Sequence, residues 1–352
     1  MRHEGGAGCR SRITHNSWLM AHGSWLPPSL HYATMADAVR MIVWAQSNQE
    51  SLVRDMVRRS GFDLVGIGSA KSADAAVLGQ ALDVETVANL RDAILCDDVQ
   101  LLWLAASESL EADERRLIRQ QATLTISLEP RPGSIAQLQS DPAEADTARF
   151  VPLMRHSPGY RAAQEVFEQL GNRQCVNVSF RSGPSEGSLF ARLFDAIDLL
   201  EALCGDVETM DAALAGPLSA PPESLGGLHG HLTLNMRFSG NCCACVALSD
   251  CAGSWFRGVT VLAEAGCLRI DDQGFEWISL DGETIDSHRE KKRATPGELI
   301  AVHAMRVLEN VQATEPPPNH AKLLAVCEAT RLSCRTGQGE TPRKMLEMLS
   351  RP

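Results

Sequence analysis

Between residues 40 and 133, short apolar runs alternate with segments whose apolar residues recur at helical spacing. The apolar runs are predicted strands at 41–44, 62–68, 99–105 and 124–128. The intervening segments are predicted helices at 50–60, 73–82, 84–95 and 110–121. Strands that are apolar throughout and separated by helices indicate a parallel sheet covered on both faces. Residues 40–133 are therefore predicted to form a small doubly wound, Rossmann-type domain, which ends at the chain breaker Pro130-Arg131-Pro132-Gly133.

The pattern changes beyond residue 133, where strands become longer and follow one another directly. Predicted strands lie at 176–180, 231–237, 242–248, 258–263, 266–270 and 275–280. Predicted helices lie at 158–170, 189–203, 298–311 and 321–334. The segments 239–241 and 264–266 are typical of hairpin turns. Residues 134–352 are thus predicted to form an α+β domain with an open, largely antiparallel sheet closed by C-terminal helices, so the chain as a whole is α/β.

The first 39 residues show neither a helical nor a strand period. These residues include Gly, Ser, His and Pro, with apolar runs of only about three residues. This composition predicts that residues 1–39 form a disordered tail. Regular pattern begins just after Met35, so Met35 is an alternative start to Met1.

Composition narrows the function classes. Of 352 residues 44% are hydrophobic, enough for a large core without disulfides. The formal net charge of -11 repels phosphate backbones and disfavours a nucleic-acid binder. No apolar run reaches the roughly 18 residues of a membrane span. Eleven cysteines, an odd number without framework spacing, indicate reduced thiols and a cytoplasmic protein.

The sequence gives no convincing metal site. Cys242, Cys243 and Cys245 are close in sequence, but on a strand Cys243 and Cys245 share one face while Cys242 points to the other. With Cys251 beyond them, the four thiolates could not converge tetrahedrally without a loop there, so these cysteines are interpreted as small core residues. His229 and His231 share a face but lack a third ligand.

Three stretches, taken in order, resemble the glucose–fructose oxidoreductase/inositol dehydrogenase (Gfo/Idh/MocA) family. Residues 187–205 are similar to the family's helix that ends in Asp-Leu-Leu and a glycine. Leu128-Glu129-Pro130 sits where the family has Glu-Lys-Pro, and Ser333-Cys334-Arg335-Thr336-Gly337 is similar to its terminal Ser-x-x-Thr-Gly. The resemblance implies a Rossmann domain followed by an open-sheet domain, an NAD(P) cofactor and a sugar-like substrate.

The turn that would hold the cofactor lacks glycine. A pyrophosphate is bound by backbone N–H groups at a helix N-terminus, and glycines allow its close approach. Here the turn reads Ala45-Gln46-Ser47-Asn48-Gln49-Glu50, and Glu50 adds a negative charge. The segment is therefore either a modified nucleotide site that binds weakly or not at all, or a plain helix start capped by Ser47 or Asn48.

The end of the second predicted strand carries no carboxylate for the ribose hydroxyls. Ser69 and Lys71 lie there instead and could meet a 2′-phosphate, which would favour NADP over NAD. The segment Ser69-Ala70-Lys71-Ser72 is also typical of a solvated loop that caps the helix predicted from Ala73.

The catalytic positions implied by the resemblance are also altered. Glu129 is followed directly by proline, so the family's lysine is missing. Asp195 falls where the family has its catalytic histidine, Ala191 where it has a supporting aspartate, and Asp198 matches. Asp195 could act as a base at neutral pH only if burial raised its pKa by several units. Alternatively, Arg192, Asp195, Asp198 and Glu201 form a polar stripe along one helix.

Three hypotheses remain open. The chain is a divergent member of the fold with weak or lost dehydrogenase activity, or an active NAD(P)-dependent sugar or cyclitol oxidoreductase with an atypical site. The third is a scaffold or assembly protein that forms a homo-oligomer through the open sheet, around residues 232–246.

Overall fold

The computed structural model describes residues 38–349 except positions 60, 109, 122, 218–219, 221 and 310–317. Met35 and almost all of the predicted tail lie outside these residues. The elements described below all belong to one compact unit that begins at Ala38.

Six parallel strands form the first sheet, in the order β3-β2-β1-β4-β5-β6. The strands are β1 (Val39–Trp44), β2 (Phe62–Gly68), β3 (Thr86–Val87), β4 (Leu101–Leu104), β5 (Leu124–Ser127) and β6 (Arg149–Phe150). This order reverses between β1 and β4, and in open parallel sheets ligands bind outside the carboxyl ends of the strands at such a switch point. The predicted Rossmann-type sheet is confirmed.

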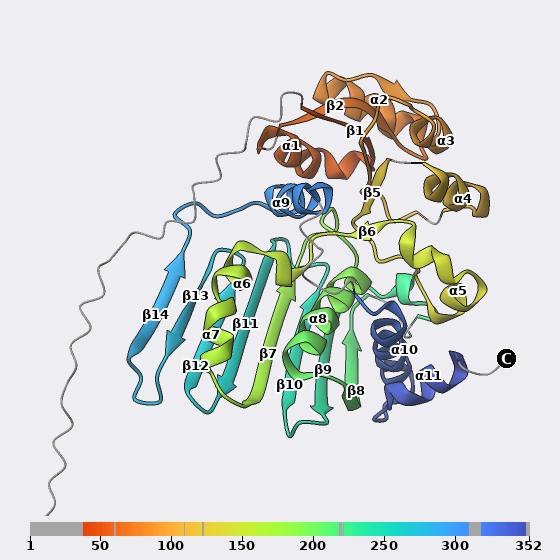
Figure 1. The fold of residues 1–352 in the computed structure, drawn as a ribbon. Helices are drawn as coiled ribbons and strands as arrows, with labels where there is room; N and C mark the ends of the chain where they lie inside the picture. Colours follow the sequence, from red (N-terminus) through yellow and green to blue (C-terminus); the bar gives the residue numbers. More distant parts are fainter. Residues whose placement is uncertain are drawn as a thin grey trace, which may run out of the picture. The chain divides into compact units, whose positions relative to one another are not determined.

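Helices lie on both faces of this sheet (Figure 1). They are the 3-10 turn η1 (Ser47–Gln49) and helices α1 (Glu50–Arg59), α2 (Ser72–Leu82), α3 (Leu90–Ile94) and α4 (Ala112–Gln120). Two apolar clusters, one around Trp103 and Val43 and the other around Leu102 and Ile42, fill the space above and below β1 and β4. Successive residues of these strands point to opposite faces, so a strand with both faces covered is apolar throughout.

Eight strands form the second sheet, in the order β14-β13-β12-β11-β7-β10-β9-β8. The strands are β7 (Arg173–Arg181), β8 (Val207–Ala215), β9 (His231–Phe238), β10 (Cys243–Ser249), β11 (Phe256–Ala263), β12 (Gly266–Asp271), β13 (Gly274–Ile278) and β14 (Thr284–Arg289). Every pair is antiparallel except β7 with β10. The predicted open sheet and both of its hairpin turns, between β9 and β10 and between β11 and β12, are confirmed.

One face of the second sheet carries its helices, and the other carries exposed side chains. The helices and 3-10 turns after β5 are α5 (Ile135–Ser140), η2 (Pro142–Asp146), η3 (Met154–His156), α6 (Pro158–Ala162), α7 (Gln164–Gln169), α8 (Leu189–Cys204), η4 (Leu225–Gly227), α9 (Pro296–Leu308), α10 (His320–Thr336) and α11 (Pro342–Leu349). Helix α8 lies across the middle strands, with α6 and α7 beside it (Figure 1). Residues of β9 alternate strictly between exposed and buried, which marks an uncovered outer face.

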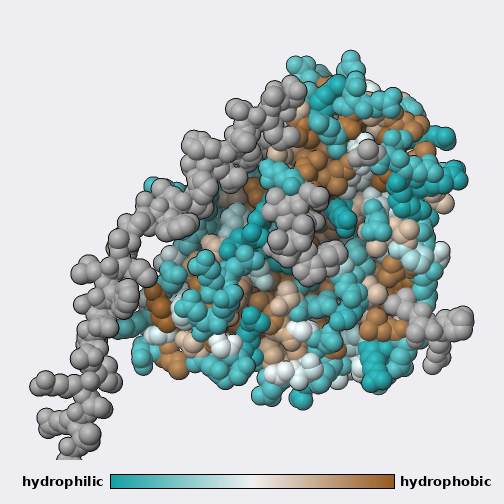
Figure 2. Space-filling model, viewed as in Figure 1, coloured by the Kyte–Doolittle hydropathy of each residue, from teal (hydrophilic) through white to brown (hydrophobic). Residues whose placement is uncertain are grey.

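The predicted domain boundary at residue 133 stays a prediction, and two later segments lie against the first sheet. β6 pairs with β5, and α9 packs on α1 with Ile300 and Ala304 inside the apolar cluster of β1. Hydrophilic residues cover much of the helical face of the molecule, and apolar ones appear there in separate patches (Figure 2).

Several predicted elements were wrong in detail. Residues 84–95 form β3 and the short helix α3 rather than one helix, because Asn89 caps α3 by accepting a hydrogen bond from the backbone N–H of Asp92. The helix predicted over 158–170 divides at Ala163. β8 and β14 were not predicted, since β8 buries few large side chains and every residue of β14 is exposed.

The interpretation of the cysteines was also partly wrong. Cys242 is buried, but Cys243 and Cys245 are exposed on the outer face of β10. The alternation of faces was predicted correctly, yet the sequence did not show which face meets the core.

Candidate functional site

The turn after β1 is closed by the side chain of Gln49. Its carboxamide Nε2 donates to the carbonyl oxygen of Ala105 at 2.8 Å and lies 3.3 Å from that of Ser185. Its Oε1 accepts the backbone N–H of Gln46 at 2.9 Å. Gln49 is buried, and its side chain crosses from the end of β1 to the residue after β4, which is the switch point of the sheet. The backbone amide of Gln46, which would face a pyrophosphate, is already satisfied within the chain.

The other candidate residues of this turn have local partners or structural positions. Ala45 is fully buried, and its N–H donates to Gly68 at 2.9 Å. Ser47 and Asn48 lie within the 3-10 turn η1, and α1 begins only at Glu50. The prediction that Ser47 or Asn48 caps α1 is therefore wrong, because Gln46 and Gln49 close the turn between them.

Ser69 and Lys71 do not converge. Ser69 is buried and lines a cavity of about 270 Å³ at the carboxyl ends of β1, β2 and β4. Lys71 precedes α2, is exposed and does not line that cavity. Only Ser69 of the pair lines this cavity, and a joint site for a 2′-phosphate stays a prediction.

Trp44, the last residue of β1, lies between the end of β2 and the segment after β4. Its indole ring packs across Gly68, where a Cβ would come within 2.3 Å of a ring carbon. Its N–H donates to Glu108 Oε2 at 3.0 Å. The glycine at the end of β2 thus makes room for the indole of this chain.

Glu129 joins the segment after β5 to the start of helix α8. It follows β5, and its two carboxylate oxygens accept the backbone N–H of Ser188 at 2.8 Å and the Ser188 hydroxyl at 2.5 Å. Ser188 is the N-cap of α8, so a carboxylate held there also complements the helix dipole. Burial raises the pKa of Glu129, although both hydrogen bonds from Ser188 oppose that shift.

Asp195 is fully buried and has a partner on each oxygen. Oδ1 accepts the backbone N–H of Met154 at 2.6 Å, and Oδ2 accepts from Arg257 Nη1 at 2.9 Å. The same guanidinium contacts Asp272 at 2.9 and 2.6 Å and the Pro152 carbonyl at 3.0 Å. Burial raises the pKa of Asp195, and Arg257 is the main opposing influence. Because both oxygens are engaged in a closed ion network, Asp195 is badly placed to accept a substrate proton.

Asp198 belongs to a second buried pair. Arg155 Nε donates to its Oδ2 at 2.7 Å, and the residue is 6% exposed. Burial raises the pKa of Asp198 to about 7, with Arg155 acting in the opposite direction. Asp195 and Asp198 thus lie on one helix but form separate ion pairs, with Arg257 and with Arg155. Glu129 contacts neither arginine through its hydrogen bonds, which both come from Ser188.

Arg192 is the most unusual group of this region. Its side chain is fully buried, yet none of its three guanidinium nitrogens has a hydrogen-bond partner among the described residues. Its Cζ lies 4.5 Å from the ring centre of Trp255, and Arg257 lies 5.1 Å from the same ring. Burial lowers the pKa of Arg192, and Asp195 is the largest influence against that shift. Three members of the predicted polar stripe, Arg192, Asp195 and Asp198, are thus buried side chains.

Two histidines that the sequence did not single out lie nearby. The rings of His156, in η3, and His303, on α9, are 4.2 Å apart and both are buried. Burial lowers the pKa of His156 to about 3 and that of His303 well below its ordinary value. Both imidazoles are therefore neutral near pH 7, and the signal that could have found them is contact between distant segments rather than a motif.

The described residues hold no group of three or more His, Cys, Asp or Glu side chains placed to bind a metal ion. His229 is 2.9 Å from Asp250, and His231 is 3.6 Å from Cys251, so the two histidines have different partners. Within the same part of the chain, no helix combines the length and the apolar composition needed to cross a membrane.

Comparison with solved structures gives close agreement over most of the chain. A levoglucosan dehydrogenase in complex with NADH and L-sorbose aligns with a TM-score of 0.66 and 12% sequence identity. The alignment covers 87% of this chain and 99% of that chain. A myo-inositol dehydrogenase from Corynebacterium glutamicum ATCC 13032 aligns with a TM-score of 0.60 and 13% identity, over 86% of this chain and 98% of that chain. GenD2 from gentamicin A biosynthesis, in complex with NAD, aligns with a TM-score of 0.61 and 16% identity, over 87% of this chain and 96% of that chain.

This chain has the Gfo/Idh/MocA fold. The predicted resemblance is confirmed at the level of the fold, with both sheets included. No family model matches the sequence, and no curated protein matches it significantly.

The two arginines over Trp255 provide a stability test. Replacing a buried charge that lacks hydrogen bonds by an apolar side chain of similar length is neutral or stabilising, by up to about 3 kcal/mol. Arg192→Met is therefore expected to keep or raise the free energy of unfolding. Arg257→Met leaves Asp195 and Asp272 unpaired and is expected to lower it by about 3–5 kcal/mol. Urea denaturation of both variants measures the difference, and an equal loss in the two would show that Arg192 has a strong partner.

Asp198 predicts a pH dependence of stability. Its pKa is about 7 in the folded protein against 3.8 for an ordinary aspartate, so folding takes up a proton between these values. The contribution of Asp198 to the free energy of unfolding is fully present below pH 3.8, the pKa of an ordinary aspartate. It is lost as the pH rises through about 7, the pKa of Asp198 in the folded protein. Relative to Asp198→Asn, the wild type is expected to lose up to about 1.4 kcal/mol of unfolding free energy per pH unit between about pH 5 and about pH 7. Parallel curves for the two proteins would contradict this assignment.

Proposed function

We propose that this chain is an oxidoreductase-fold protein whose dinucleotide site is closed and whose dehydrogenase activity is weak or lost. The observation that carries the proposal is the carboxamide of Gln49, which spans the switch point and binds Gln46, Ala105 and Ser185. A pyrophosphate accepts hydrogen bonds, so there it would need the backbone N–H of Gln46, which Gln49 Oε1 already accepts, and the space that the carboxamide fills. The residues present therefore do not fit NAD(P), and no hydride step is derived through it.

The altered catalytic positions support the same proposal. A base for sugar oxidation needs a free lone pair and a pKa near the working pH. Asp195 has both oxygens occupied, and the two nearby imidazoles, His156 and His303, are buried. Glu129 is used to hold Ser188, and no lysine follows it. These groups build a closed structural network between the sheets.

The alternative is an active NAD(P)-dependent oxidoreductase on a sugar or cyclitol with an atypical site. It is favoured by the fold neighbours, since the levoglucosan dehydrogenase and GenD2 were solved with NADH and NAD. For this chain it requires Gln49 to leave its three partners before the cofactor binds. A sugar-like ligand remains compatible with either proposal.

Cofactor titration separates the two proposals. The full chain is titrated with NADH and with NADPH while the nicotinamide fluorescence is followed. We expect no saturable signal up to about 1 mM, because a buried side chain with three hydrogen bonds must first be displaced. Gln49→Ala is expected to bind NADH more tightly than the wild type. Asn48→Ala, an exposed neighbour in the same turn, is the matched control and is expected to change nothing. Micromolar binding by the wild type would instead support the active dehydrogenase.

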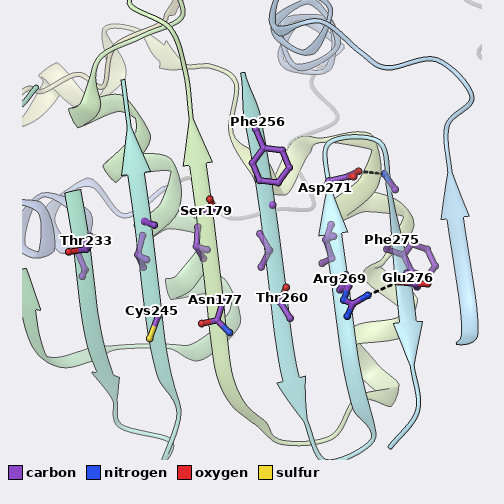
Figure 3. A pocket seen from close by; sticks show the side chains of 18 of the residues that line it. Asn177, Ser179, Thr233, Cys245, Phe256, Thr260, Arg269, Asp271, Phe275 and Glu276 are labelled. Atoms are coloured by element: carbon purple, nitrogen blue, oxygen red, sulfur yellow. Dashed lines mark hydrogen bonds and ion pairs between the residues drawn. The ribbon is translucent and has the colours of Figure 1, made fainter. Parts of the chain in front are cut away.

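A second candidate role, self-association, is favoured by the outer face of the second sheet. One continuous cross-strand row there consists of Asn235, Cys245, Asn177, Thr260, Arg269 and Glu276. Most of the row is small and uncharged, and Arg269 and Glu276 pair with each other at 3.3 Å (Figure 3). This face lines a hollow of about 700 Å³. Exposed strands with few unpaired charges suit packing against the same face of a second copy.

Light scattering tests this second role. If the outer face joins two copies, the wild type has the mass of a dimer, and Cys245→Arg, in the middle of the row, is expected to be a monomer. Ala76→Arg on the exposed side of α2 is the control and is expected to leave the mass unchanged. A wild-type monomer at every concentration would dispose of this role.

A further inference from the structure

Two thiols meet where the end of helix α8 packs against the hairpin of β9 and β10. The Sγ atom of Cys242 lies 3.2 Å from the Sγ atom of Cys204, although the two residues are 38 positions apart in the chain. Both are free thiols. A disulfide bond is about 2.05 Å long, so the two sulfurs need to approach each other by little more than about 1 Å to form one.

The two thiols differ in their access to solvent. Cys204 is the last residue of α8 and is half-buried, whereas Cys242 precedes β10 and is 6% exposed in the apolar core of the second sheet. A dissolved oxidant therefore reaches Cys204 first, and Cys242 lies behind it. This order suits an intramolecular disulfide, because an accessible thiol that is oxidised first is then attacked by a protected partner.

The surroundings of Cys204 do little to stabilise a free thiolate. Burial raises the pKa of Cys204, and the neighbouring Cys242 thiol acts in the same direction. The guanidinium of Arg173 opposes this shift and is held nearby, because its Nη1 donates to the Leu203 carbonyl at 2.6 Å. A thiol that gains little from ionisation reacts slowly, but its disulfide also resists reduction. We therefore expect slow oxidation and a persistent disulfide.

The segment between the two cysteines contains the edge strand of the second sheet. β8 ends the strand order beside β9, and only Met210 and Ala212 of this strand are buried (Figure 1). A bond between residues 204 and 242 would enclose β8, η4 and β9 in one covalent loop. Because such a link restricts the unfolded chain, it stabilises a region whose edge strand has few buried contacts.

We propose that Cys204 and Cys242 form a redox-active dithiol, which a low-molecular-weight disulfide such as oxidised glutathione converts into an intramolecular disulfide. The Cys204 thiolate attacks one sulfur of oxidised glutathione, forms a mixed disulfide and releases one glutathione. The Cys242 thiolate then attacks Cys204 Sγ and releases the second glutathione. Two protein thiols are oxidised, one glutathione disulfide is reduced, and the two protons leave on the glutathione thiols. This site is independent of the turn after β1 and of dehydrogenase activity.

Peptide mapping of the full chain tests the proposal. The reduced protein is incubated with oxidised glutathione, the remaining thiols are alkylated, and the digest is analysed by mass spectrometry before and after reduction. The peptide that contains Cys204 is expected to be linked to the peptide that contains Cys242. Recovery of both residues as alkylated thiols, or only as separate mixed disulfides with glutathione, would overturn the proposal.

Two adjacent cysteines offer a matched pair of variants. Cys242→Ala removes the buried partner, so the link is expected to disappear and Cys204 to retain glutathione. Cys243→Ser removes the exposed thiol next to it, on the other face of β10, and is expected to leave the link intact. A link that survives in Cys242→Ala, or one that is lost in Cys243→Ser, would assign the bond to Cys243 and contradict the proposal.

Thermal unfolding measures what the bond does to the fold. The oxidised wild type is expected to unfold about 5–10 °C above the reduced protein, because the bond closes a long loop in the unfolded chain. Dithiothreitol is expected to reverse this shift, and Cys242→Ala is expected to show none after the same treatment. An unchanged midpoint in wild-type protein whose link has been mapped would contradict the proposed stabilisation of the sheet edge.

Discussion

The proposed function depends on the hydrogen bonds of one carboxamide at the carboxyl end of the first sheet. Gln49 reaches from the turn after β1 to the carbonyl of Ala105 after β4 and to Ser185, which precedes α8. In a doubly wound sheet this crossing lies where the strand order reverses, and the pyrophosphate of a bound dinucleotide would need the backbone N–H of Gln46, which Gln49 Oε1 accepts. The side chain therefore links the turn after β1 to Ala105 and to Ser185, and in the proposed function it also closes that turn to a phosphate.

The hydrogen bonds of Glu129 and Asp195 agree with the proposed closure of the turn. Glu129 holds the N-terminus of α8 through Ser188, and Asp195 is tied to Met154 and Arg257. Buried charges of this kind are stable only as complete sets, because removal of one member leaves its partner uncompensated. Of the positions that the fold resemblance marks as catalytic, Glu129 thus connects the segment after β5 to α8, and Asp195 connects α8 to β11. A fold can persist while its site changes, so similarity of structure leaves activity to the site residues.

The sequence predicted the sheets well and the site poorly, for physical reasons. Continuous apolar strands and alternating ones differ in period, so β1, β4, β9 and β10 were recognisable from local pattern. β14 carries no buried residue and gave no such signal. The partner of Asp195 lies 62 residues away on β11, and that of Glu129 lies 59 residues away. No local pattern reports such contacts, and the indole of Trp44 over Gly68 became visible only once β1 and β2 were paired.

The most direct measurement is a crystal structure of the protein grown with saturating NAD. The account predicts that the Gln49 carboxamide stays hydrogen-bonded to Ala105 and Gln46 and that no dinucleotide density appears over the turn after β1. Density for a pyrophosphate on the backbone amides of Gln46 to Asn48, with Gln49 swung aside, would contradict it.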